Sequence, residues 1–217
     1  MVKKQTGQRI FLLSPAYAGG RRARMLLSDR AGFDLARRLR SKEGATIAEV
    51  FTFLSGLYFR GKIAYANTFA RVRNGSCGVF VITSTRGLVD ARSTITLADL
   101  REFAEVDIDA ADPRYRKPLE HSVRRLAKTL ADGCDGVLLG SIATGKYVDI
   151  FIDHFKEHLR FPADFVGRGD MSRGGLMLRC ASDRHELNYM SVKGAMLHGA
   201  RPPKLEPRRY PKGWPSS

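Results

Sequence analysis

Cysteine is scarce in this sequence, and its few copies follow no pattern. Cys77, Cys134 and Cys180 are odd in number, far apart and without CxxC spacing. Such an arrangement argues against a disulfide framework and against a zinc knuckle. We therefore expect a protein of a reducing compartment, the cytoplasm, that folds without covalent cross-links.

Long apolar runs are missing as well. The N-terminal run IFLL ends at Ser14 and Pro15, so it is too short for a signal peptide or a membrane span. The 217 residues are 43% apolar, which is enough to fill one core. We expect a single α/β domain over residues 1–200. Residues 201–217 carry five prolines and predict a basic tail that is extended or disordered.

Acidic residues are outnumbered. The chain has 37 Lys and Arg against 22 Asp and Glu, which gives a net charge of +15 and an isoelectric point of about 10.2. This excess points to a polyanionic partner, and DNA is the partner we expect. No basic amphipathic helix carries Trp or Phe on its apolar side, so a membrane is not expected. Residues 102–112 hold five acids and no base, which predicts a separate face that is not basic.

Short apolar runs bordered by glycine alternate with segments of helical periodicity. This alternation predicts a three-layer α/β sandwich around a central, mostly parallel sheet of four to five strands. From Thr46, an N-cap with Glu49 at the capping-box position, the pattern predicts one long helix or two helices broken at Ser55-Gly56. The expected strands are 9–14, 77–84, 136–141, 163–167 and 175–180, and the expected helices are 21–28, 33–41, 46–71, 118–131, 146–161 and 184–200.

Ligands of such sheets bind at the carboxyl ends of the parallel strands. This rule selects four loops, each with Gly, Ser or Thr next to Arg or Lys: 14–22, 83–90, 140–146 and 165–175. We expect these loops to converge into one positively charged cleft that grips a phosphodiester chain.

Two of these loops are candidates for phosphate binding. Backbone N–H groups and basic side chains at the start of a helix favour an anion, although structural turns explain the same composition. GSIATGK has the spacing of a nucleotide-binding P-loop, but Tyr147 replaces the Ser or Thr that would contact magnesium, so ATP binding is not expected. The candidate nucleic-acid ligands in these loops are Ser14, Gly19, Gly20, Arg21, Arg22, Ser141, Thr144, Gly145 and Lys146.

Aromatic and basic side chains mix at Tyr58, Arg60 and Lys62, as in a platform on which bases stack. Helical spacing offers core packing as the alternative for the aromatic residues, whereas burial does not explain Arg60 and Lys62. His154 and His158 have the i, i+4 spacing of a zinc helix but lack a convincing third ligand. We expect no metal and no other cofactor.

Three motifs resemble a known group of proteins. SGLYFRGKIAYANTFA, VFVITSTRGLVD and VLLGSIATGKY are similar to segments of the families allied with the YaaA peroxide-stress proteins. The fold of that group looks like the uracil-DNA glycosylase superfamily, which implies the same fold here over residues 9–180. The loop SPAYAGGRR lacks the water-activating Asp or Asn of that superfamily, and the chain has no His-Pro-Ser motif. Uracil excision by the familiar residues is therefore not expected.

The resemblance implies a DNA glycosylase that removes a modified or damaged base in repair or in phage defence. Base excision needs a carboxylate that orients water or stabilises the sugar cation. Asp170 is the first candidate, and Glu49 and Asp90 are weaker ones. Their structural alternatives are a turn, the capping box and a cap of the next segment. Further candidates for nucleic-acid binding in the same loop as Asp170 are Arg168, Ser172 and Arg173.

Two alternatives stay open. The first is a DNA-binding module with the same architecture and no chemistry, which the resemblance also implies. The second is an enzyme that hydrolyses the N-glycosidic bond of free nucleosides or nucleotides, whose phosphates the same loops suit. An enzyme of the glycosylase type should lose turnover on Asp170→Asn and keep its DNA affinity, whereas a binder should tolerate that change.

Overall fold

The computed structural model describes residues 7–73, 75–130, 133–143, 145–193 and 202–207. Helices and strands are interspersed along this part of the chain. The elements in chain order are β1 (Arg9–Leu13), α1 (Arg21–Leu27), α2 (Asp34–Arg40), β2 (Ala45–Thr46), α3 (Ile47–Ser55), α4 (Leu57–Phe69), β3 (Val79–Ile82), β4 (Leu88–Asp90), β5 (Thr94–Ile95), α5 (Leu97–Ala104), α6 (Pro113–Thr129), β6 (Asp135–Leu139), α7 (Val148–Phe155), the 3-10 helix η1 (Lys156–His158), β7 (Leu159–Pro162), the 3-10 helix η2 (Ala163–Phe165), α8 (Asp170–Ser182) and β8 (Tyr189–Ser191).

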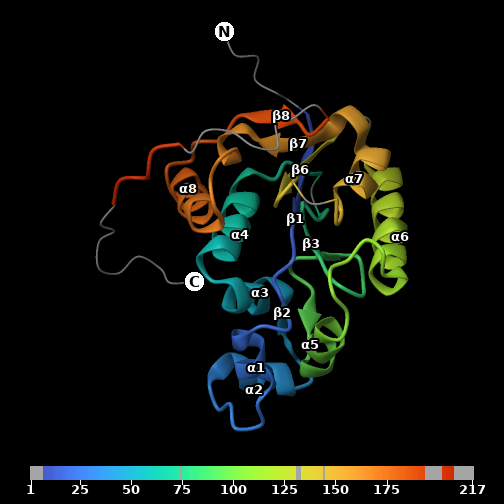
Figure 1. Cartoon of the computed structure of the whole chain (residues 1–217), viewed down its shortest axis with the longest axis vertical. Coiled ribbons are helices and arrows are strands. Elements are labelled where there is room, and N and C mark those ends of the chain that lie inside the picture. Colours follow the sequence, from blue (N-terminus) through green and yellow to red (C-terminus); the bar gives the residue numbers. More distant parts are fainter. Residues whose placement is uncertain (1–6, 74, 131–132, 144, 194–201, 208–217) are drawn as a thin grey trace.

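A sheet of six strands forms the centre of the described residues, in the order β4-β3-β1-β6-β7-β8. β1 pairs in parallel with β3 and β6, and β6 pairs in parallel with β7. The edge strands β4 and β8 are antiparallel to their neighbours. Helices α4 and α8 lie on one side of the sheet, and α6 and α7 on the other (Figure 1). The α/β prediction is confirmed. The expected four to five strands are wrong, because β4, β7 and β8 escaped the pattern and two of the predicted strands are helical.

The central strand β1 explains why this sheet is covered on both faces. All five of its residues, RIFLL, are buried. A continuous apolar run without alternation is what a strand packed on both sides requires. Its register places Leu13 opposite Val81 of β3 and Leu139 of β6. The carboxyl ends of the parallel strands therefore share one edge of the sheet, and the loops that follow them start close together.

Helices α4 and α8 pack with their backbones in contact. A Cβ atom added to Gly61 of α4 would lie 2.6 Å from the carbonyl oxygen of Gly174 in α8. A Cβ atom added to Gly174 would lie 2.8 Å from the carbonyl oxygen of Leu57. Only glycine permits so close an approach at both positions. The contact fixes the residues adjacent to the two glycines, Lys62 in α4 and Arg173 in α8, relative to the sheet.

Helices α1, α2, α3 and α5 lie beyond the carboxyl end of β1, together with the short β2–β5 pair (Figure 1). The Thr46 hydroxyl accepts from the Glu49 amide at 3.2 Å, and the Glu49 carboxylate accepts from the Thr46 amide at 3.1 Å. This is the predicted capping box at the start of α3. At Gly56 φ is +63°, a left-handed value that suits glycine. The chain breaks there into α3 and α4, as one of the two alternatives predicted.

The helix predicted to begin at Pro118 begins earlier. The Asp112 carboxylate accepts from the Arg114 amide at 2.8 Å and caps the helix. Pro113 takes the first helical position, where its missing N–H is tolerated. Pro118 lies inside α6. Both prolines are compatible with the start of a helix, but α6 begins at Pro113 because Asp112 caps it there.

Segment 146–161 holds a helix and a strand rather than the one helix predicted. α7 ends at Phe155, and Lys156 adopts a φ of +49°. After the short η1, residues Leu159–Pro162 pair with β6 as β7. The open edge of β6 supplies backbone hydrogen bonds to this apolar run, and the helical periodicity of the sequence carried no information about that edge.

The strands predicted for 163–167 and 175–180 are also wrong. Residues 163–165 form η2, and residues 170–182 form α8, so the expected loop 165–175 shrinks to 166–169. The buried residues of α8 recur at every third position and pack on α4. A six-residue apolar run does not distinguish a strand from a helix, and the tertiary contact with α4 decided.

The helix predicted for 184–200 is wrong in its described part. Tyr189–Ser191 forms β8, antiparallel to β7. Residues 194–200 lie outside the described part of the chain. Of the predicted tail, residues 202–207 have no regular structure. They lie against α8 and the segment before it, where the Arg168 guanidinium donates to the Pro203 carbonyl at 3.3 Å.

The three cysteines are free thiols, in agreement with the absence of a predicted disulfide framework. Within the described ranges, we find no helix whose length and apolar character would let it cross a membrane.

Candidate functional site

A cleft of about 610 Å³ opens at the carboxyl ends of β1 and β6. The loop after β1 forms one wall, the loop after β6 a second, and the segment after α5 a third. This is the edge of the sheet at which α/β proteins bind their ligands. The lining residues are Ser14, Pro15, Ala16, Tyr17, Asp107, Ile108, Asp109, Lys146 and Tyr147.

Ser14 lies at the floor of the cleft and rests on a buried lysine. Lys62 of α4 is 1% exposed and Ser14 is 9% exposed. The Lys62 ammonium donates to Ser14 Oγ at 2.6 Å and to the Ser14 carbonyl oxygen at 3.1 Å. It also lies 4.0 Å from the centroid of the Tyr58 ring. Lys62 does not line the cleft itself, so it acts on the cleft through Ser14.

Burial lowers the pKa of Lys62 to about 7. Loss of hydration is the largest cause, because an ammonium loses water on entering the protein interior. The Asp170 carboxylate raises this pKa, and the Arg173 guanidinium lowers it. Near neutral pH the amine therefore exists in both forms, which is the condition for accepting and returning a proton.

Tyr147 closes the cleft on the side of β6. Its hydroxyl accepts from the Ser141 amide at 3.1 Å. A Cβ atom added to Gly140 would lie 2.7 Å from Ser14 Cβ and 2.8 Å from the Tyr147 hydroxyl oxygen. Glycine at position 140 therefore lets Ser14 and Tyr147 meet. Burial raises the pKa of Tyr147 while a hydrogen bond with Ser14 lowers it, and the net effect is a rise, so the phenol keeps its proton at neutral pH.

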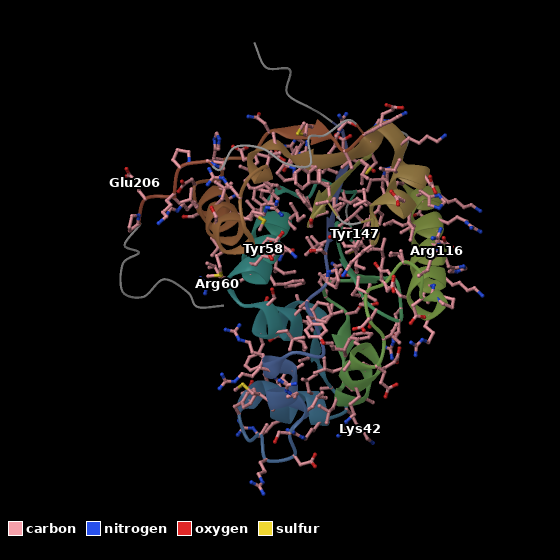
Figure 2. The ribbon with its side chains drawn as sticks, in the orientation of Figure 1. Lys42, Tyr58, Arg60, Arg116, Tyr147 and Glu206 are labelled. Atoms are coloured by element: carbon pink, nitrogen blue, oxygen red, sulfur yellow. The ribbon has the colours of Figure 1, made fainter. Side chains whose placement is uncertain are left out.

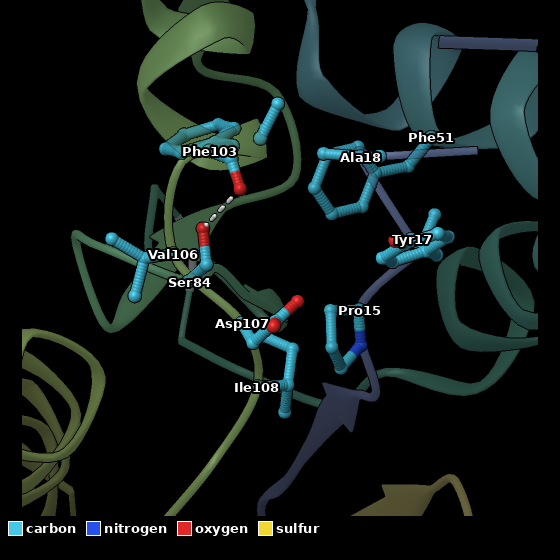
Figure 3. Close-up of a pocket in the computed structure, with 12 residues that line it drawn as sticks. Pro15, Tyr17, Ala18, Phe51, Ser84, Phe103, Val106, Asp107 and Ile108 are labelled. Carbon is cyan, nitrogen blue, oxygen red and sulfur yellow. Dashed lines mark hydrogen bonds between the residues drawn. The ribbon is translucent and has the colours of Figure 1, made fainter. Parts of the chain in front are cut away.

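The acidic segment predicted to lie on a separate face forms the third wall of the cleft. Figure 3 shows Asp107 next to Ile108 and across from Pro15. The Asp109 carboxylate accepts from the Ala111 amide at 3.0 Å. The Asp107 carboxylate has no hydrogen bond or ion pair with a described residue. Asp107 is therefore the carboxylate that is available to a ligand.

The Tyr17 ring stands at the mouth of the cleft and is 69% exposed. A Cβ atom added to Gly19 would lie 2.6 Å from the Tyr17 hydroxyl oxygen, and one added to Gly20 would lie 3.3 Å from its ring. The two glycines thus make room for the ring rather than for a phosphate. An exposed aromatic face of this kind can stack on a nucleobase.

A narrow cavity of about 20 Å³ lies beside the cleft, between the β1 loop and α5 (Figure 3). The Ser84 hydroxyl, from the loop after β3, donates to the Phe103 carbonyl at 2.8 Å and closes one side. The space suits a single water molecule. The loop after β3 therefore reaches the site region but contributes packing rather than an open surface.

The prediction of one positively charged cleft is wrong in its charge. The loops after β1 and β6 do converge, but among the described lining residues Lys146 is the one cation, beside Asp107 and Asp109. The physical reason is a long-range contact, because the chain after α5 folds back over the β1 loop. Two other predicted ligands belong to the loop after β6. A Cβ atom added to Gly145 would lie 3.2 Å from a carboxylate oxygen of Asp149. Thr144 lies outside the described residues.

A second surface near the β1 loop carries the arginines that the cleft lacks. Arg21, Arg24 and Arg30 line an open hollow of about 440 Å³ on α1, together with the half-exposed Met25 and with Phe33. We call this surface the arginine hollow. Arg22 points elsewhere and donates to the Phe53 carbonyl at 3.1 Å.

The predicted loop 165–175 does not reach the cleft. Arg168 donates to the Ser172 hydroxyl at 3.2 Å and to the Asp164 carbonyl at 3.0 Å, and Arg173 donates to the Phe165 carbonyl at 3.0 Å. These arginines hold the chain rather than a ligand. Asp170 is exposed in the first turn of α8 and lines a different hollow, which the segment 202–205 shares.

The two weaker acid candidates are engaged in local structure. The Glu49 carboxylate, besides its capping role, forms an ion pair with Arg38 at 2.8 Å, and this hydrogen bond lowers its pKa to about 2. The Asp90 carboxylate accepts from the Arg92 amide and guanidinium, both at 2.8 Å. Neither residue lines the cleft.

The stacking platform predicted around Tyr58 does not exist in that form. Tyr58 is buried, and its ring covers Lys62 instead of facing solvent. The expectation that burial does not account for Lys62 is wrong as well. Arg60 is exposed, and Figure 2 shows it at the outer end of α4.

Sequence reasoning missed Tyr17, Asp107, Asp109 and Tyr147. Tyr147 was noted only as a departure from the P-loop pattern, and the acids only as part of an acidic segment.

No group of three or more potential metal ligands occurs among the described residues. His158 lies beyond the end of α7, 3.4 Å from the Asp135 carboxylate, so the helical spacing with His154 is broken. Comparison with protein-family models, with curated proteins and with solved structures finds no match to this chain.

Proposed function

We propose that this protein binds DNA and hydrolyses the N-glycosidic bond of a modified or damaged base that enters the cleft. One observation carries the proposal: an exposed aromatic ring, Tyr17, and an available carboxylate, Asp107, line opposite walls of a cleft at the carboxyl ends of the central strands. Base excision requires these two groups, a stacking surface for the flipped base and an acid for the sugar.

The mixed charge of the cleft suits the sugar and base rather than the phosphates. A flipped nucleoside is close to neutral, so Asp107 and Asp109 do not repel it. The phosphates would stay outside, on Lys146 at the rim and on the arginine hollow beside the β1 loop. The net charge of +15 supports a polyanionic partner of this kind.

The chemistry follows from the charge that develops on the sugar. Cleavage of the N-glycosidic bond leaves positive charge on the sugar ring and negative charge on the departing base. The Asp107 carboxylate would stabilise the cation and orient the attacking water, and the Lys146 ammonium would donate to the base. Repair of damaged DNA and defence against phages with modified DNA are the settings in which such an activity serves a cell.

The test is a base-release assay on the purified chain. DNA strands, single and double, each carrying one modified or damaged base, are incubated with the protein and then treated with alkali, which breaks the strand at abasic sites. We expect breaks at one class of base. Asp107→Asn should lower this turnover by roughly 100-fold or more while DNA affinity stays within twofold of wild type, about the loss typical of a missing acid or base group.

Asp153→Asn, an exposed acid on the outer side of α7, is the matched control and should retain full turnover. Loss of turnover on Asp170→Asn, with Asp107→Asn unaffected, would transfer the catalytic assignment back to Asp170. Absence of breaks with every base would refute excision.

A DNA-binding module without chemistry is the second candidate. It is favoured by the position of Asp170, the first acid that the sequence offered, which lies in the first turn of α8 and outside the cleft. For this candidate, DNA binding should persist in Asp107→Asn and Asp170→Asn, and no substrate should be turned over.

A further inference from the structure

The hydroxyl of Ser14 is the most unusual group in the molecule, because it lies between a buried amine and a buried phenol at the floor of an open cleft. Lys62 Nζ is 2.6 Å from Ser14 Oγ on one side. The Tyr147 hydroxyl lies on the other side. A Cβ atom added to Gly140 would lie 2.8 Å from the Tyr147 hydroxyl oxygen and 3.0 Å from Ser14 Oγ. Base excision uses none of these three groups.

We propose that Ser14 is an activated nucleophile, with Lys62 as its general base, and that the cleft hydrolyses a carboxylic ester. The inference goes beyond base excision and holds whether or not the cleft receives nucleic acid. Pairs of serine and lysine perform acyl transfer on unrelated folds, where the amine replaces the usual histidine.

The geometry holds Lys62 in place for this role. Its nitrogen contacts Ser14 Oγ, the Ser14 carbonyl and the Tyr58 ring, and the apolar part of its side chain is fully buried. Ser14 follows the last residue of β1, whose register is fixed on both sides by β3 and β6. The nucleophile therefore lies directly at the end of a central strand, and the base lies on a packed helix.

Activation requires a neutral Lys62. Burial lowers the pKa of this amine to about 7, the nearby Asp170 carboxylate raises it and Arg173 lowers it. Tyr58 and Tyr147, the other ionisable groups facing the pair, keep their protons at neutral pH, because burial raises the pKa of both phenols. The neutral amine consequently becomes the main form just above neutral pH.

The reaction balances in two steps. Ser14 Oγ attacks the carbonyl carbon of the ester, Lys62 takes the hydroxyl proton, and the bond to the alkoxide breaks as the Lys62 ammonium returns that proton to the leaving alcohol. Water then attacks the acyl-serine, Lys62 takes a proton from the water, and the carboxylic acid leaves while Ser14 regains its proton. The sum is ester plus water to acid plus alcohol, and no further reactant is needed.

The donors at the floor suit an acyl group. The Tyr147 oxygen accepts from the Ser141 amide, and its hydroxyl, which is hydrogen-bonded with Ser14, can turn to donate toward the carbonyl oxygen of a bound ester. One neutral donor fits the single oxyanion of acyl transfer. A phosphoryl group spreads its negative charge over three oxygens and needs several cations, whereas Lys146 is the one cation among the described lining residues.

The test uses an alkyl fluorophosphonate, which forms an Oγ–P bond with an activated serine and releases fluoride. The full-length protein is labelled between pH 5.5 and 9, and the modified residue is located by peptide mass. We expect a single label on Ser14, with a rate that rises about tenfold per pH unit below 7 and levels off above it, as the fraction of neutral amine does. Hydrolysis of p-nitrophenyl acetate should follow the same profile.

Variants separate this role from a structural one. Ser14→Ala should abolish labelling, and Lys62→Met, which keeps the apolar contacts of the lysine, should slow it about 100-fold. Ser76→Ala, an exposed serine beside Gln8 at the opposite end of β1, is the control and should label normally. Absence of label on the wild-type protein, label on another serine, or an unchanged rate in Lys62→Met would overturn the proposal. The site and pH profile of labelling in the wild-type protein test the proposal even if a variant fails to fold.

Discussion

At the residue scale, position 140 is the tightest point of the site. Ser14 and Tyr147 occupy the space that any side chain at this position would need. Gly140→Ala should lower the free energy of unfolding by about 1–3 kcal/mol, as overpacking of a core does. Urea unfolding measures the change.

The same substitution should remove fluorophosphonate labelling, because it moves Ser14 from Lys62. Gly32→Ala, where an added Cβ meets no atom within 4 Å, serves as the control and should change stability by less than about 0.5 kcal/mol. Equal effects of the two substitutions would show that Gly140 imposes no close contact.

Lys62 makes the stability of the fold depend on pH. Its pKa is about 7 in the folded chain and 10.5 as its ordinary value, so between these values the unfolded chain holds a proton that the folded chain has lost. The free energy of unfolding of the wild type should therefore rise with pH in this window, relative to Lys62→Met, by up to about 1.4 kcal/mol per pH unit.

Urea unfolding of both proteins from pH 6.5 to 9.5 tests this dependence. Below pH 7 the charged amine is buried at full cost, so the relative stability of the wild type is lowest there. Parallel pH profiles of the two proteins would mean that Lys62 has an ordinary pKa.

The roles of residues were predicted best where they depend on neighbours that are close in the sequence. The capping box of Thr46 and Glu49 depends on residues three apart, and the sequence revealed it. The burial of Lys62 depends on Ser14, which lies 48 positions away along the chain, and no local pattern records that contact. A lysine on an aromatic-rich helix looked like a surface residue for this reason.

At the element scale, the contact of α4 with α8 positions the site. Gly61→Ala or Gly174→Ala should each cost about 1–3 kcal/mol, because backbone atoms within 3.0 Å of the new methyl group force the helices apart. Separation of the helices should also shift Lys62, so labelling of Ser14 should slow in both variants. Thermal unfolding and the labelling rate are the two measurements.

Gly175→Ala on α8 is the matched control for these variants. Its added Cβ would meet Leu205 at 3.5 Å, an ordinary contact, so the variant should gain up to about 1 kcal/mol from the better helix propensity of alanine. Destabilisation of this variant equal to that of Gly174→Ala would contradict the special role of the close contact.

The same contact explains why the sequence misassigned this part of the chain. Gly174 looked like the border of a strand, whereas it is the point at which two helices touch. The central strands β1, β3 and β6 were predicted correctly, because buried parallel strands are unbroken apolar runs. The edge strands β4 and β8 depend on partners that the local pattern does not name.

At the scale of the whole molecule, charge is distributed in a way that composition did not predict. The acidic segment after α5 faces the cleft, while arginines gather on α1 and along the outer side of α6, where Figure 2 shows Arg116 directed to solvent. The net charge could be read from the sequence. The distribution of the charged side chains over the surface could not, because it depends on how the chain after α5 returns to the β1 loop.

DNA affinity should therefore depend on salt and on the position of each cation. Binding should weaken steeply between 50 and 200 mM salt, by at least roughly tenfold, because phosphate contacts release counterions. Lys146→Glu at the rim of the cleft should weaken binding more than Arg116→Glu on α6, although the two changes in net charge are equal. Fluorescence anisotropy with a labelled oligonucleotide measures both, and equal losses would indicate nonspecific attraction.

Hydrogen exchange with and without a DNA oligonucleotide tests most directly whether the cleft at the ends of β1 and β6 receives DNA. We predict slower exchange of backbone amides in residues 14–20 and 145–149 and in the segment 105–111 when DNA is present, with the outer side of α6 unchanged. Protection confined to α6 or to the arginine hollow, or no protection at all, would contradict the proposal that this cleft is the nucleic-acid site.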